Sequence, residues 1–344
     1  MQTQTAYGIP REGPQITIVD MEDIADAEYE DNPVIDGLLD ERESLLVCGP
    51  SGIGKSIFVN YITLLMANPS PTKLWDLFHI PKPLKSVIIQ SENGIKSIHR
   101  RLNKIFRVNA DFRKGAAYVF IPRIRGDCRM TGNLTETDFQ QQVIEILKAA
   151  QADVLVLDPL ISFHGGNEND NAEMRRSLDC LTYICDMADV CCIVIHHVGK
   201  GNTKNDVFSG RGASAIGDWA ANILIFERSE QGGIIKVTHQ KARNFNTIKP
   251  FYIQRTPDLQ LLRIANPETK QDQYVKCVIE ILGDMPGRKV NTQTELIEMV
   301  QARLNCKRST AQTAINKARD MKKIIVIPGG KKGNATGYRL PDEN

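Results

Sequence analysis

Residues 49–56 read Gly-Pro-Ser-Gly-Ile-Gly-Lys-Ser and match the pattern G-x-x-x-x-G-K-[S/T] at every position. An apolar stretch at 44–48 leads into this segment, and a stretch with helical periodicity, 57–66, follows it. Glycines let the backbone curl so that successive N–H groups point at phosphate oxygens, and the N-terminus of the next helix adds to the attraction. A strand–loop–helix phosphate cradle is therefore predicted, formed by Gly49, Pro50, Ser51, Gly52, Ile53, Gly54, Lys55 and Ser56.

Two residues of the cradle carry further chemistry. Lys55 places a positive charge at the β- and γ-phosphate oxygens, and the Ser56 hydroxyl is a ligand for Mg²⁺. Such a site also needs a carboxylate from a neighbouring strand, and the apolar stretch 154–157 ends in Asp158. Asp158 could instead cap a helix before Pro159, but its spacing favours the metal ligand. We therefore expect ATP and Mg²⁺ as ligands.

Hydrolysis also needs a group that orients or deprotonates the attacking water. Pro159 follows Asp158, so the common Asp-Glu pair is absent at that strand end. Glu92 follows another apolar stretch, 86–90, and is the candidate for this role. The alternative is that Glu92 is a solvated loop carboxylate.

Short apolar runs alternate with longer amphipathic stretches between residues 35 and 255, which predicts an α/β fold with a mostly parallel, doubly wound sheet. Later strands, at 234–239 and 251–255, could be antiparallel. The remaining predicted strands are 44–48, 86–90, 154–157, 191–196 and 222–226, and the predicted helices are 57–66, 95–106, 136–149 and 171–188.

The character of the chain changes near residue 266. Three helical stretches, at 271–282, 292–304 and 309–321, precede two short strands at 324–327 and 338–340. The strands flank a basic, glycine-rich tip, and this order is typical of a small C-terminal winged-helix domain. The predicted division is an acidic arm at 1–34, an α/β core at 35–265, a linker at 266–272 and the winged helix at 273–344.

The net charge of +2 hides an asymmetry, because residues 1–40 sum to −9 and residues 270–344 to +6. A basic terminal domain favours nucleic acid as its partner, although many winged helices bind proteins, so duplex DNA and a replication protein both remain open. The candidate DNA contacts are Lys307 and Arg308 at the start of the recognition helix, and Lys331 and Lys332 on the wing.

The eight cysteines form no C-x-x-C pair and lack zinc-ligand spacing. Several lie in apolar stretches, which indicates buried free thiols in a reducing cytoplasm. The chain has no N-terminal apolar segment and no apolar run near 18 residues, so neither secretion nor a membrane span is expected. The expected location is cytoplasmic.

The P-loop, Glu92 and Asp158, in this order, resemble the RecA-like P-loop NTPase core of ring helicases, and most closely the RepA-type plasmid helicases, over residues 35–255. The resemblance implies that Glu92 is the catalytic base. It also implies that the pair His196-His197, which ends the strand after Asp158, senses the γ-phosphate or couples the site to DNA. Two histidines satisfied at a strand end are the alternative.

Further downstream, Arg211 stands where the family has an arginine that reaches the ATP of the neighbouring subunit, and Lys241-Ala242-Arg243 resembles the K-x-R finger of DnaB-type helicases. Either arginine could instead be a surface residue. A finger acting in trans implies a ring or a filament, and the resemblance to ring helicases leads us to expect a hexameric ring. In such folds the loop at 199–210 faces the central channel, where Lys200 and Lys204 suit the backbone of single-stranded DNA.

The leading hypothesis is a helicase or translocase on single-stranded DNA, acting in plasmid, phage or mobile-element replication. A recombination mediator, meaning a DNA-dependent ATPase that does not unwind, is the second hypothesis. A regulator or loader whose ATP state switches its assembly is the third.

Overall fold

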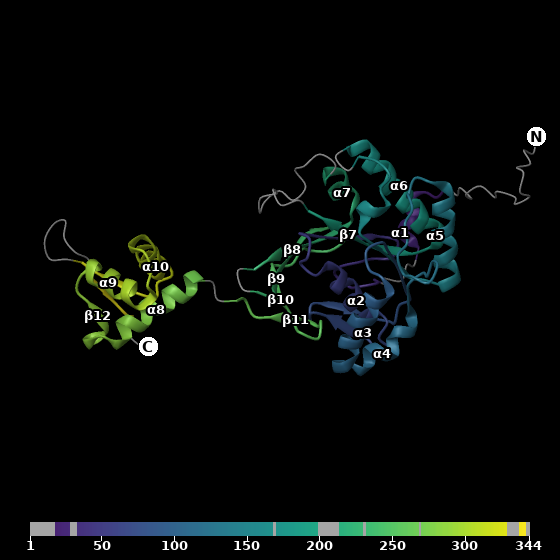
Figure 1. The fold of residues 1–344 in the computed structure, drawn as a ribbon. Helices are drawn as coiled ribbons and strands as arrows, with labels where there is room; N and C mark the ends of the chain where they lie inside the picture. The colour runs from purple at the N-terminus through teal and green to yellow at the C-terminus, as the bar shows by residue number, and fades with distance from the viewer. Residues whose placement is uncertain are drawn as a thin grey trace, which may run out of the picture.

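The computed structural model describes most of the chain, and Figure 1 draws its helices and strands and labels many of them. Five of the predicted site residues, Arg211, Lys200, Lys204, Lys331 and Lys332, lie outside the described ranges. The ranges described are 18–27, 33–167, 170–198, 213–229, 232–267, 270–328 and 337–341.

A nine-stranded sheet runs through the described part of the core in the order β11-β10-β9-β8-β1-β7-β6-β4-β5. The six strands β8, β1, β7, β6, β4 and β5 pair in parallel with their neighbours in this order. The strands β8, β9, β10 and β11 pair with one another in antiparallel fashion. The predicted α/β fold with a mostly parallel sheet is confirmed. The strands are β1 (Ser44–Gly49), β4 (Ser86–Gln90), β5 (Val119–Phe120), β6 (Val154–Asp158), β7 (Cys191–His197), β8 (Asn222–Arg228), β9 (Ile234–Ala242), β10 (Phe251–Arg255) and β11 (Leu261–Ile264).

Strand β1 is apolar throughout because it is covered on both faces. Leu45 and Val47 belong to one buried cluster, while Leu46 and Cys48 belong to another. Successive side chains of a strand point to opposite faces, so a central parallel strand needs apolar residues at every position. The helices on the two faces are α2 (Lys55–Met66), α3 (Ile95–Val108) and α4 (Ala110–Gly115) with the first cluster, and α5 (Thr137–Ala150), α6 (Asn171–Ala188) and α7 (Ala213–Trp219) with the second.

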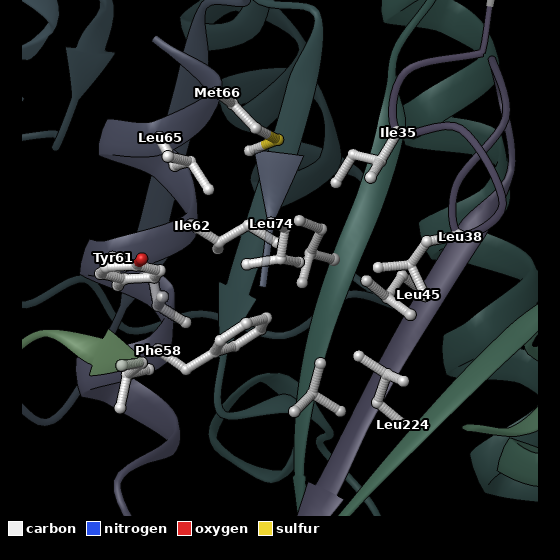
Figure 2. Close-up of a cluster of buried hydrophobic side chains, with 14 of the residues drawn as sticks. Ile35, Leu38, Leu45, Phe58, Tyr61, Ile62, Leu65, Met66, Leu74 and Leu224 are labelled. Carbon is white, nitrogen blue, oxygen red and sulfur yellow. The ribbon is translucent and has the colours of Figure 1, made fainter. Parts of the chain in front are cut away.

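Helix α2 fixes the P-loop against the sheet. Figure 2 shows Phe58 and Ile62 of this helix among the side chains of Leu45 and Leu74. Phe58 is fully buried and stacks on Trp75, with ring centroids 5.5 Å apart. Truncating such a buried aromatic side chain to alanine costs about 3–5 kcal/mol, so the packing of α2 holds the start of the helix in place.

Some short elements escaped the sequence prediction. The hairpin β2 (Thr72–Leu74) and β3 (Phe78–Ile80), the helix α4 and the strands β5 and β11 were not expected. Each spans two to six residues, too short for its periodicity to stand out from a loop. The arm also contains a short helix, α1 (Met21–Asp26), which the Asp20 side chain caps.

The C-terminal part has its own core and sheet. Helices α8 (Lys270–Asp284), α9 (Gln293–Leu304) and α10 (Arg308–Asp320) pack with the three-stranded order β12-β14-β13 around residues from 275 to 340. Helix α8 begins at Lys270, one residue before the predicted helical stretch 271–282 and inside the predicted linker 266–272, whose bounds stay a prediction. The strands are β12 (Lys289–Val290), β13 (Ile325–Ile327) and β14 (Gly337–Arg339).

All eight cysteines are free, and six of them are buried, as predicted. Within the described ranges, none of the helices combines the length and the apolar character needed to cross a bilayer.

Candidate active site

Four neighbouring strands end at the same edge of the sheet, and their ends hold the predicted site residues. Gly49, at the end of β1, lies opposite His197 of β7 in the strand register. On the adjoining pair, Gln90 of β4 lies opposite Asp158 of β6. The parallel register therefore brings the P-loop, His197 and Asp158 together, and Glu92 follows Gln90 by two residues.

The P-loop glycines occupy positions that a side chain could not. Gly54 has a φ of +116°, in the left-handed region that L-residues rarely adopt. A Cβ on Gly49 would lie 2.8 Å from the carbonyl oxygen of Phe226 on β8. The loop therefore depends on glycine for its backbone conformation at one position and for close packing against the sheet at another.

Lys55 is the charged centre of the loop, and only 4% of its surface is exposed. Its ammonium donates to the carbonyl oxygens of Gly49 and Pro50, the latter at 3.1 Å, and lies 2.9 Å from His197 Nδ1. Burial lowers the pKa of Lys55 to about 8, and the nearby Asp158 carboxylate opposes that shift. All three ammonium hydrogens have a partner, so an incoming phosphate must replace these bonds.

Asp158 is almost completely buried next to the Ser56 hydroxyl. Burial raises the pKa of Asp158 to about 6, while a hydrogen bond with Ser56 and the charge of Lys55 oppose the rise. A carboxylate and a hydroxyl are the oxygen ligands that suit Mg²⁺, and a cation there would offset the cost of the buried charge. The described residues contain no cluster of three or more His, Cys, Asp or Glu that could bind a metal by themselves. A Mg²⁺ ion here would therefore depend on phosphate oxygens for further ligands.

Glu92 lies on a turn that Gln90 holds in place. The buried Gln90 amide donates to the carbonyl oxygens of Asn93 and Cys128, at 2.8 and 2.6 Å, and its oxygen accepts from the Asn93 N–H. The Glu92 side chain is about half exposed, and its Oε1 lies 3.8 Å from His197 Nε2. A carboxylate that is fixed through its backbone yet reached by solvent is suited to accept a proton from water.

His197 connects Lys55 and Glu92. Burial and the charge of Lys55 lower the pKa of His197, whereas Glu92 has the opposite effect. The neutral imidazole accepts the Lys55 hydrogen bond at Nδ1, so its proton is on Nε2, the nitrogen nearer to Glu92. The preceding residue, His196, is more deeply buried, and its pKa is lowered to about 4. The two histidines thus have different environments, and His197 alone of the pair contacts Lys55 in the described structure.

Arg101 of α3 is a site residue that the sequence prediction missed. Burial lowers the pKa of Arg101, and the charges of Asp158 and Glu92 oppose that shift. Arg101 lies three residues after the buried Ile98 and four before the buried Ile105, on the inner face of α3. The helical period of Ile98 and Ile105 places Arg101 on the inner face of the helix that follows Glu92. This period could have indicated Arg101 from the sequence.

Lys241 and Arg243 lie at the opposite end of the sheet from the P-loop of the same chain. Strand β9 is antiparallel, and its end at Lys241 pairs with Ile223 near the start of β8. Lys241 donates to the carbonyl oxygens of Gly217 and Asp218, at 3.0 and 3.1 Å, and Arg243 lies 3.9 Å from Glu43, just before β1. These residues can reach a P-loop only in another copy of the chain.

Two other arginines lie beside the P-loop. Arg228 donates from Nη2 to the Ser51 carbonyl oxygen at 2.9 Å, and Arg255 Nη1 is 3.6 Å from the position of a Cβ on Gly54. They line a cavity of about 260 Å³ together with Gly52, Ile53, Ser229, Gly232, Gly233, Ile234 and Ile235. The cavity is open space next to the phosphate cradle.

The fold and the site together define a P-loop ATPase. A family model described as an AAA domain matches residues 10–203, more than half of the chain, and the protein belongs to this family.

Solved structures to which this chain is similar include a KaiC-like protein from Pyrococcus horikoshii OT3, with 16% identity and a TM-score of 0.49 over 70% of this chain and 99% of that chain. Another is the RadB recombinase, with 16% identity and a TM-score of 0.44 over 65% of this chain and 92% of that chain. Among curated proteins, no match to this sequence is found.

Proposed function

We propose that this ATPase is a ring-forming helicase or translocase that moves along single-stranded DNA. The observation that carries the proposal is that two groups of proposed active-site residues lie at opposite ends of the sheet. Lys55, Asp158 and Glu92 gather at one end of the sheet, whereas Lys241 and Arg243 lie at the other. An arginine finger acting between copies, arranged head to tail, explains this separation, and such contacts form a ring when the rotation between neighbouring copies closes.

In this proposal, the residues of one chain bind ATP and prepare the water. Lys55 exchanges its carbonyl and histidine partners for β- and γ-phosphate oxygens. Ser56 and Asp158 would hold Mg²⁺, which would supply positive charge to neutralise the phosphates. Glu92 accepts a proton from the water that attacks the γ-phosphorus, the bond to the bridging oxygen breaks, and ADP and phosphate are released. The cavity between Arg228 and Arg255 accommodates the base and ribose.

His197 links phosphate occupancy to Glu92 in this scheme. When Lys55 turns to the γ-phosphate, the His197 Nδ1 loses its hydrogen bond, and the imidazole is free to reorient towards Glu92 or the phosphate. His197 is the last residue of β7, and Lys200 and Lys204 follow it closely in the sequence. The state of the nucleotide is thereby passed to the segment that we propose contacts DNA.

Mixing two inactive variants tests the shared site. Glu92→Gln removes the base, and Arg243→Ala or Arg211→Ala removes a finger. Because the lost groups act in different copies, mixed assemblies contain some intact sites, and we expect partial recovery of ATPase activity. The measurement is phosphate release at a series of mixing ratios. No recovery with either arginine variant at any ratio would overturn the trans finger.

Unwinding of a forked duplex separates the candidate functions. A ring helicase displaces one strand in a manner that depends on ATP. A recombination mediator hydrolyses ATP on single-stranded DNA without displacing a strand, and a loader or regulator shows little stimulation of its ATPase by DNA. ATPase stimulated by single-stranded DNA without displacement, measured with a fluorescent fork, would replace the helicase proposal by the mediator.

We also propose that the C-terminal part is a winged-helix domain. Support comes from the order of its three helices and the β12-β14-β13 sheet, and from the exposed Lys307 and Arg308 at the start of α10. In this arrangement α10 is the recognition helix. The domain would dock the motor on its DNA or on a replication protein.

A further inference from the structure

Helix α10 has one buried face and one open face. Ala311, Ala314, Ile315 and Ala318 are buried against α8 and α9 in the C-terminal core. The opposite side carries short polar side chains at positions that form one helical face. These residues are Ser309, Gln312, Thr313 and Asn316, of which Ser309 and Thr313 are exposed and Gln312 and Asn316 are partly exposed.

The chemistry of this open face suits the edges of DNA bases. Among these four residues there is neither a carboxylate, which would repel phosphate, nor a large apolar side chain, which would favour a protein interface. Carboxamides offer a donor and an acceptor together, the combination that recognises adenine N7 and N6 in the major groove. The Gln312 amide donates to Asn316 Oδ1 at 3.3 Å, which leaves Gln312 Oε1 and both amide hydrogens of Asn316 for other partners.

Positive charge lies at both ends of the same helix. Lys307 and Arg308 are exposed at its start, and Lys322 and Lys323 are exposed just beyond its end. The acidic residue at the end of α10, Asp320, is paired with Arg319 at 3.1 Å. Cations that flank a polar face can hold a helix to the phosphates on both sides of a groove while the face contacts bases.

We propose that α10 binds duplex DNA in the major groove and selects its sequence through adenine contacts of Gln312 and Asn316. The basic residues at the ends of the helix bind phosphates and give no selectivity. A helix of 13 residues is about 20 Å long, enough to follow the groove over several base pairs. This site is independent of the motor, and it makes the chain selective for where it assembles.

The test begins with a selection by the full-length protein from a library of randomised duplexes, without nucleotide. We expect one enriched motif that contains adenine. Fluorescence anisotropy then compares the selected duplex with a scrambled duplex of the same composition. The Lys55→Ala variant should give the same motif, because failure of the motor leaves this site intact.

The double variant Gln312→Ala/Asn316→Ala should bind the selected duplex about tenfold more weakly, with little change for the scrambled one. Lys307→Ala/Arg308→Ala should weaken both duplexes equally and reduce the dependence on salt. The matched control, Thr294→Ala/Glu298→Ala on the exposed side of α9, should change neither. Equal melting temperatures establish that each variant is folded.

Three outcomes would overturn the proposal. The selection could enrich no motif, the carboxamide variant could weaken both duplexes equally, or the full-length protein could bind single-stranded DNA and both duplexes alike. Any of these results would mean that α10 binds phosphates without reading bases, or that its face serves a protein partner.

Discussion

Two buried charges in the active site lower the stability of the folded protein until nucleotide and metal bind. Lys55 is buried with a pKa near 8, and Asp158 is buried with a pKa near 6, although the two groups attract each other. Their mutual attraction therefore offsets only part of the cost of removing both from water. Phosphate and Mg²⁺ supply the missing counter-charges, which makes binding of the ligand a source of stability.

The first prediction concerns protons. At pH 8 about half of Lys55 is neutral, and a bound triphosphate favours the charged form, so binding should take up as much as about half a proton per ATP. Isothermal titration in two buffers of different ionisation enthalpy measures this uptake. At pH 6.5 Lys55 is already protonated, and its contribution should vanish. Equal uptake at both pH values would contradict the assignment to Lys55.

The second prediction concerns the stability of the protein without Mg²⁺ or nucleotide. The pKa of Asp158 is raised in the folded state, so folding favours its protonated form and stability falls as the pH rises from about 4 to 6. Asp158→Asn removes this charge. At pH 7.5 in EDTA, we expect the free energy of unfolding of the variant to be about 1–3 kcal/mol higher than that of the wild type, measured with denaturant.

The gain from Asp158→Asn should disappear near pH 4, where the native carboxyl is already protonated. Mg²⁺ and ATP should stabilise the wild type and have much less effect on the variant. A variant that is less stable than the wild type at pH 7.5 would show that the buried carboxylate is well compensated without a metal.

At the scale of elements, α3 shows how a helix carries a site residue on its inner face. Ile98 and Ile105 bury the helix, and Arg101 between them is directed by the same periodicity to the region of Asp158 and Glu92. The start of α3 is also fixed, because the Asp127 carboxylate accepts from the Ile95 N–H at 2.9 Å. Packing and capping together determine where Arg101 lies.

The third prediction follows from that placement. Arg101→Gln should lower the ATPase kcat about 100-fold and change ATP affinity much less, because the charge lies beside the proposed base and metal ligand. The matched control is Arg100→Gln, an exposed position on the same helix turned away from the site. The readouts are steady-state phosphate release and binding of a fluorescent ATP analogue. Equal effects of the two substitutions would exclude Arg101 from the site.

Most of the longer elements were predictable, whereas several of the short ones were not. The sequence indicated β4, β10 and α6 within their observed limits, because each has a clear apolar run or helical period. The hairpin of β2 and β3 has three residues in each strand. Its apolar residues are buried in the same cluster as the apolar residues of α2. Such elements follow from tertiary packing rather than from local pattern.

At the scale of the whole molecule, the buried residues form clusters in two parts of the chain. The two clusters around the large sheet end with Leu261, and the C-terminal cluster begins at Val275. The described residues thus show no shared core between the two parts. This supports the predicted boundary near residue 266, which remains a prediction.

The fourth prediction tests this boundary. A chain that ends after Pro267 should keep its stabilisation by ATP and Mg²⁺, because every P-loop contact described here lies before that residue. It should lose the selectivity for the selected duplex. Calorimetry of the full chain should show one transition that ATP shifts and one that it does not. A single transition that is fully shifted by ATP would mean that the two parts unfold together.

The sequence by itself determined the phosphate cradle, its strand–loop–helix setting and the α/β class, because glycine positions and apolar periods are local properties of the chain. It also indicated Glu92, Asp158 and His197 as candidates. Tertiary structure decided that these residues meet, since the strand order places β4, β6, β7 and β1 side by side. It added Arg101, and it placed Lys241 and Arg243 at the far end of the sheet. Distances across a sheet depend on strand order, which no local pattern encodes.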